Sequence, residues 1–82
     1  MTTYVWMTDT FMSGWGPAKG KTNIYCIECD NDDQAKIVKA NAQKRSEMRG
    51  IHMTDYPPQQ TSDRIISHKH FSELGPIWTE AS

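Results

Sequence analysis

Two cysteines three positions apart are the residues of this chain that most suggest chemistry. Cys26 and Cys29 form a C-x-x-C sequence, the spacing of a zinc ligand pair or of a redox-active thiol pair. A strand turns successive side chains to opposite faces, so residues at this spacing in a strand do not converge on one ion. Cys26 also falls inside a predicted strand, away from a helix N-terminus that would lower its pKa. We therefore interpret both as small buried hydrophobic side chains.

Two histidines offer a second candidate site. In an extended segment His68 and His70 share a face, so both imidazoles could reach one metal ion. The chain has three histidines, and no convincing further ligand accompanies this pair. We interpret both as polar side chains at the edge of the sheet. We expect neither a metal nor any other cofactor.

Residues 14–22 read GWGPAKGKT, which approaches a phosphate-binding loop. A Walker A loop needs four residues between its first glycine and the Gly-Lys-Thr. Gly16 leaves three and Gly14 leaves five, and Thr22 runs into a predicted strand instead of a helix. We interpret the segment as a glycine-rich connection between strands. No G-x-S-x-G or other local catalytic signature is present, so a non-enzyme is expected.

Strands that could position these side chains follow from runs of β-forming residues. We expect them at residues 4–8, 23–29, 51–54 and 64–68. In the second strand, Tyr25, Ile27 and Cys29 fall on one face, which we expect to be the inner one.

The segment from residue 30 to residue 50 predicts the single amphipathic helix of the chain. Asn31 and Gln34 have the spacing of a capping box, and Gly50 is a natural stop. Its apolar stripe consists of Ala35, Val38 and Ala42. The order ββαββ predicts an α+β fold with a small antiparallel sheet of about four strands packed on one amphipathic helix.

Length and charge limit the remaining classes. The 82 residues predict one domain, 1–82, with an irregular C-terminal tail at about 71–82. Nine Lys/Arg against ten Asp/Glu give a net charge of −1, which directs the protein toward neither nucleic acid nor anionic membrane. No apolar run approaches the roughly 18–20 residues of a membrane span. Two cysteines do not form a disulfide framework, so a reducing cytoplasm is expected.

The glycine-rich connection also carries Phe11, Met12 and Trp15. Loops usually carry polar residues, so these side chains either fold back onto the core or form an exposed patch. Exposed Trp and Met are enriched in protein interfaces. Both alternatives stay open at the level of sequence.

Residues 6–16, with the string MTDTFMSGWG, and residues 20–23 resemble a family of small, mostly uncharacterised bacteriophage and prophage proteins. Residues 28–48 resemble the same family, and the likeness covers roughly the first 55 residues. The family offers no catalytic residues to carry over. The resemblance implies a phage-encoded accessory protein in the cytoplasm of the bacterial host. Small accessory proteins of this kind often bind a host protein, and inhibitors of CRISPR–Cas or other defence complexes are one class.

We therefore expect a protein that binds and inhibits a host or defence-system protein by occlusion, as an anti-CRISPR inhibitor would. The expected partner-binding residues are three loop residues and four acidic residues able to mimic phosphates: Phe11, Met12, Trp15, Glu28, Asp30, Asp32 and Asp33. The alternative is a small nucleic-acid-binding protein that uses a basic helix face: Lys36, Lys39, Lys44, Arg45 and Arg49. We expect no membrane partner, and a monomer or small homo-oligomer.

Overall fold

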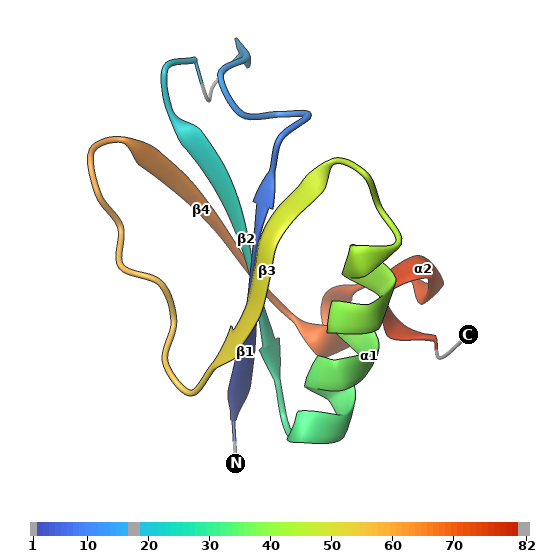
Figure 1. Ribbon diagram of the computed structural model, residues 1–82. Helices are drawn as coiled ribbons and strands as arrows, with labels where there is room; N and C mark the ends of the chain where they lie inside the picture. The colour runs from blue at the N-terminus through green and yellow to red at the C-terminus, as the bar shows by residue number, and fades with distance from the viewer. Residues whose placement is uncertain (1, 17–18, 81–82) are drawn as a thin grey trace.

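A computed structural model describes residues 2–16 and 19–80 of the chain. The described elements are β1 (Thr3–Asp9), β2 (Thr22–Cys29), α1 (Asp32–Gln43), β3 (Met48–Thr54), β4 (Arg64–His70), the 3-10 helix η2 (Phe71–Glu73) and α2 (Pro76–Thr79). The strands form one sheet and α1 packs on one of its faces (Figure 1). The fold is the predicted small α+β class. Among the described residues, no helix is both long enough and apolar enough to cross a membrane.

The sheet is mixed, so the prediction of an antiparallel sheet is wrong at one edge. Its strand order is β3-β1-β2-β4, with β1 antiparallel to both β2 and β3 and with β4 parallel to β2. The last two strands therefore run in the same direction at opposite edges. Residues 55–63 join them by running back along the sheet on the side away from α1 (Figure 1). This long return, in place of a tight hairpin, makes β4 parallel to its neighbour.

The start of α1 follows the predicted capping pattern. Asn31 is the N-cap, and its side-chain oxygen accepts a hydrogen bond from the backbone N–H of Gln34 at 2.9 Å. The Gln34 side chain in turn accepts from the backbone N–H of Asp30 at 2.8 Å. These bonds satisfy backbone donors that an uncapped first turn would leave without partners.

The predicted helix end at Gly50 is wrong, because α1 stops at Gln43 with Lys44 as its C-cap. Gly50 instead lies in β3 with a φ of 60°. Trp6 pairs with His52 whereas Thr8 pairs with Arg49, so β3 carries one extra residue at this point. A glycine with positive φ is the usual first residue of such a bulge.

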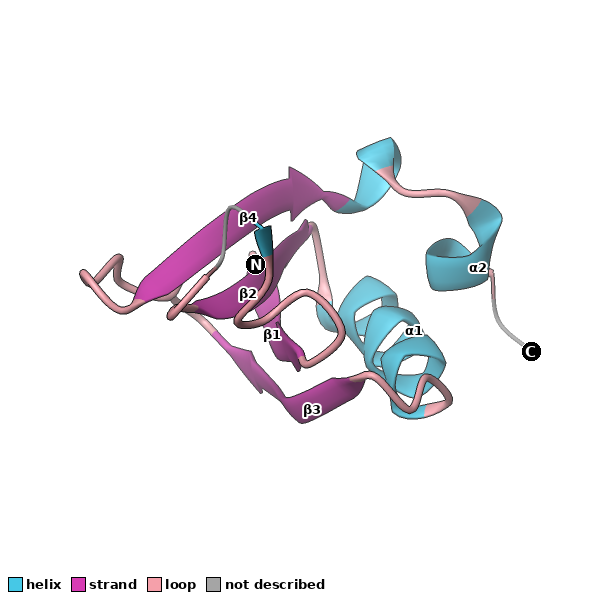
Figure 2. Cartoon of the chain, turned by 90° about the horizontal axis from the view of Figure 1, so that it is seen from above, coloured by secondary structure: helices cyan, strands magenta, loops and turns pink. Residues whose placement is uncertain are grey.

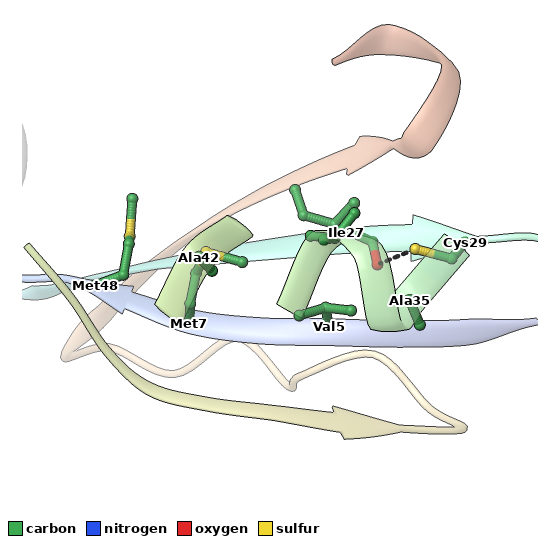
Figure 3. Close-up of a cluster of buried hydrophobic side chains, with 8 residues drawn as sticks. Val5, Met7, Ile27, Cys29, Ala35, Ala42 and Met48 are labelled. Atoms are coloured by element: carbon green, nitrogen blue, oxygen red, sulfur yellow. Dashed lines mark hydrogen bonds between the residues drawn. The ribbon is translucent and has the colours of Figure 1, made fainter. Parts of the chain in front are cut away.

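The core lies between α1 and the sheet (Figure 2). It comprises the apolar stripe of the helix and side chains from three strands: Val5, Met7, Ile27, Cys29, Ala35, Val38, Ala42 and Met48. Figure 3 shows seven of them labelled, with the Cys29 thiol donating to the Ile27 carbonyl oxygen at 3.8 Å. Tyr25 packs against this cluster, which confirms the predicted inner face of β2.

The C-terminal segment is more ordered than the predicted irregular tail. Residues 71–80 contain η2 and α2, and residues 81–82 lie outside the described part of the chain. The buried side chain of Asn41 on α1 donates to the backbone oxygens of Trp78 at 2.8 Å and of Glu80 at 3.0 Å. A buried amide needs such partners, so Asn41 fixes α2 against α1.

Candidate functional site

The loop between β1 and β2 presents three apolar side chains to solvent. Phe11 is 74 % exposed, Trp15 is 70 % exposed and Met12 is 38 % exposed. The alternative in which these side chains fold back onto the core is therefore wrong. We refer to the described residues 10–16 and 19–21 as the β1–β2 loop, which leaves the sheet at the top of Figure 1.

Asp9, the last residue of β1, holds the backbone of this loop. The residue is only 5 % exposed, and one carboxylate oxygen accepts hydrogen bonds from the backbone N–H of Phe11 at 3.0 Å and of Met12 at 3.3 Å. The hydroxyl of Ser13 donates to the Asp9 carbonyl oxygen at 2.6 Å and accepts from the Asn23 backbone N–H at 2.9 Å. The base of the loop is thus tied to both of its strands.

Further backbone bonds fix the shape of the loop. Thr10 donates from both its backbone N–H and its hydroxyl to the Glu47 carbonyl oxygen, each at 2.7 Å. Gly14, at a φ of 83°, donates to the carbonyl oxygen of Lys21 at 3.1 Å. Few residues other than glycine adopt that φ without strain. The exposed apolar side chains therefore stand on a backbone that is held in place.

A groove of about 760 Å³ opens beside the loop. Its lining includes residues from both strands, from the turn after α1 and from α2: Met7, Phe11, Tyr25, Arg45, Glu47 and Trp78. Burial raises the pKa of Tyr25, and the negative charge and hydrogen bond of Asp9 raise it further. The Arg45 guanidinium lies 2.7 Å from a Glu47 carboxylate oxygen and 5.1 Å from the ring centroid of Trp78. Sequence reasoning missed this groove, because its walls come from segments that only the fold brings together.

The four predicted acidic residues lie at the other end of β2. Glu28 contacts His68 Nε2 at 3.1 Å, Asp30 contacts His70 Nε2 at 2.9 Å, and Asp32 accepts from the Thr3 hydroxyl at 2.6 Å. Asp33 is exposed on the first turn of α1.

These acidic residues do not join the loop in one surface. The loop enters β2 at Thr22, and Glu28 lies six positions further along the strand. At about 3.3 Å per residue the separation is about 20 Å. Of the predicted partner-binding residues, the structure therefore keeps Phe11, Met12 and Trp15 in one loop and places the four acidic residues elsewhere.

The predicted basic face is also divided by the fold. Lys36 and Lys39 lie on α1, Lys44 caps its end, and Arg45 is bound to Glu47. Arg49 lies in β3 opposite Thr8. Because Thr8 alternates with the core residue Met7, Arg49 belongs to the sheet face away from α1. These five cations therefore do not share one surface.

The cysteines and histidines do not form a metal site in the described part of the chain. Cys26 and Cys29 are both fully buried, and only Cys29 belongs to the core beneath α1. Burial raises the pKa of each thiol to about 11, so both are protonated at neutral pH and are poor nucleophiles. His68 and His70 contact different carboxylates. Residues 2–16 and 19–80 contain no group of three metal-ligating side chains.

The GKT sequence runs directly into β2, which begins at Thr22, as predicted. It therefore lacks the helix N-terminus that a phosphate-binding loop requires. Pro17 and Ala18 of the same segment lie outside the described residues.

No protein-family model, no curated protein and no solved structure matches this chain. The bacteriophage origin expected from the sequence therefore stays a prediction.

Proposed function

We propose that the protein binds another protein through the β1–β2 loop and acts by covering part of that protein's surface. The observation that carries this proposal is the combination of exposed Phe11 and Trp15 with a fixed backbone beneath them. Burying a large apolar side chain is worth about 1.5–3 kcal/mol, and here the fold leaves that contribution unused. A loop that already has its bound shape also loses less conformational entropy on association.

The rest of the molecule favours binding over catalysis. The two thiols are buried and protonated, and His68 and His70 are each bound to a carboxylate. These groups do not form a nucleophile with an adjacent base. The target class that we propose is a host or defence-system protein in a bacterial cytoplasm, as the sequence led us to expect.

The experiment compares the proteins captured by tagged wild type and by Trp15→Ala from a bacterial lysate, followed by binding of the purified captured protein to each. Trp15 is largely exposed, so the substitution leaves the core intact, which circular dichroism checks. Tyr56→Ala is the matched control, because Tyr56 is an aromatic residue that is 58 % exposed and follows β3 at the opposite end of the sheet. We expect Trp15→Ala to lose the partner and Tyr56→Ala to keep it. Retention of the same proteins by all three would overturn the proposal.

A further inference from the structure

The fold gathers positive charge around the β1–β2 loop. Lys19 and Lys21 belong to the loop itself. Arg49 of β3 pairs with Thr8, next to the last residue of β1. Arg64, the first residue of β4, pairs with Thr22, the first residue of β2. Four cations from three separate stretches of sequence thus lie at the end of the sheet from which the loop leaves (Figure 1).

The opposite end of the sheet is acidic. It holds the end of β2, the first turn of α1 and the residue after β3, with Glu28, Asp30, Asp32, Asp33 and Asp55. The net charge of −1 therefore conceals two ends of opposite sign. They lie about 20 Å apart, well beyond the screening length of about 8 Å at physiological ionic strength. A partner at the loop experiences mainly the positive end.

The carboxylates near the loop offset only part of this positive charge. Asp9 is buried against the loop backbone, and Glu47 is paired with Arg45. Lys19, Lys21 and Arg49 are exposed, and within residues 2–16 and 19–80 no ion pair involves them. A hydrogen bond from Thr61 and the charge of Arg64 both lower the pKa of Asp63, the remaining acid among the described residues at this end, so Asp63 offsets Arg64.

We infer that the partner presents an apolar pocket with an acidic rim, an inference that rests on the proposed function. Phe11 and Trp15 enter the pocket, and Lys19 and Lys21 face carboxylates around it. A protein fits this arrangement better than a nucleic acid does. Single strands bind along a positive groove with stacking platforms, whereas here the exposed lysines belong to a loop that also exposes Phe11 and Trp15. Complementary rim charges mainly raise the association rate and make it sensitive to salt.

The test uses the purified protein captured in a Trp15-dependent manner. Its affinity is measured for wild type, for Lys19→Glu/Lys21→Glu and for Lys36→Glu/Lys39→Glu. The last variant reverses two charges on α1, away from the loop, and is the matched control. At about 50 mM salt we expect the loop variant to bind about tenfold more weakly than wild type, with a much smaller difference at about 300 mM. The α1 variant should stay within about twofold at both concentrations.

The outcomes separate the two proposals. If Trp15→Ala abolishes binding while the loop-lysine variant binds as tightly as wild type at low salt, the acidic rim is wrong and the proposed function stands. If Trp15→Ala retains the partner, the proposed function is wrong, and the inferred acidic rim is wrong as well. Capture that disappears after nuclease treatment would identify a nucleic acid and would also overturn the inference. Lys19→Gln/Lys21→Gln only removes charge, so its affinity for the partner should lie between those of wild type and of the glutamate variant.

Discussion

Asp9 is the residue whose loss should most disturb the β1–β2 loop while leaving its apolar side chains unchanged. Its carboxylate accepts hydrogen bonds from the backbone N–H groups of Phe11 and Met12 and lies against the hydroxyl of Tyr25. Alanine at this position removes every side-chain acceptor at once. Two backbone donors and the partly buried hydroxyl of Tyr25 then lose this acceptor.

The structure sets the size of this effect. A hydrogen bond to a charged group contributes about 1.5–3 kcal/mol, and the bond from Met12, at 3.3 Å, lies at the weak end. We therefore expect Asp9→Ala to lower the free energy of unfolding by about 2–4 kcal/mol. With a urea dependence of about 1 kcal/mol per M for a small domain, the unfolding midpoint falls by about 2 M or more. Asp9→Asn keeps one oxygen acceptor, so it should cost about half as much.

Urea unfolding and amide hydrogen exchange measure the two parts of this prediction. In Asp9→Ala the amides of Phe11 and Met12 should exchange faster than in wild type, under conditions where the core amide of Val38 is still protected. Asp55→Ala is the control, because Asp55 is an exposed acid at the far end of the sheet. It should change stability by less than about 0.5 kcal/mol. The reasoning is refuted if Asp9→Ala matches Asp55→Ala in midpoint and leaves the two loop amides unchanged.

Two further predictions concern His70 and Gly50. A hydrogen bond to Asp30 raises the pKa of His70, and nearby carboxylates add to this against a smaller opposing effect of burial. Stabilisation from this pair is therefore complete below the unfolded value of about 6.5 and is lost as the pH rises through the folded pKa. NMR titration should give His70 a pKa above 6.5, and Asp30→Asn should lower that pKa. A wild-type pKa at or below 6.5 would contradict this prediction. Gly50→Ala, at a φ of 60°, should lower the free energy of unfolding by about 1–2 kcal/mol in thermal or urea unfolding. Gly75→Ala, at a negative φ, should lower it clearly less. Equal losses of stability would count against backbone strain at Gly50.

Gly50 shows how far local sequence signals reach. A glycine after a helical pattern and a glycine in a β-bulge satisfy the same requirement, a positive φ. The sequence therefore predicts the backbone angle at this position, but it does not say which element contains it. Pairing of β3 with β1 decides that. In contrast, the capping of α1 by Asn31 depends on residues within one turn, and the sequence predicted it correctly.

The direction of β4 was beyond prediction for a similar reason. Its alternating side chains mark a strand, but they read the same in a parallel and in an antiparallel pair. The choice depends on where residues 55–63 carry the chain after β3, which is a property of the whole sheet. The loop shape that exposes Trp15 likewise depends on hydrogen bonds that Asp9 and Glu47 accept and that Asn23 donates. These residues lie outside the loop's own string of apolar residues.

The spatial distribution of charge is the property that the sequence predicts least well and the fold determines most. Read along the chain, Asp9 resembles any other acid, while Glu28 and Asp30 stand out because they precede a helix. In three dimensions Asp9 is buried beneath the loop, and the other two contact histidines at the far end of β2. With its nearest acids buried or paired, the loop end keeps a positive surface around Trp15. An apolar tip set in such a surface selects a partner by both shape and sign, whereas the tip alone would bind any apolar pocket.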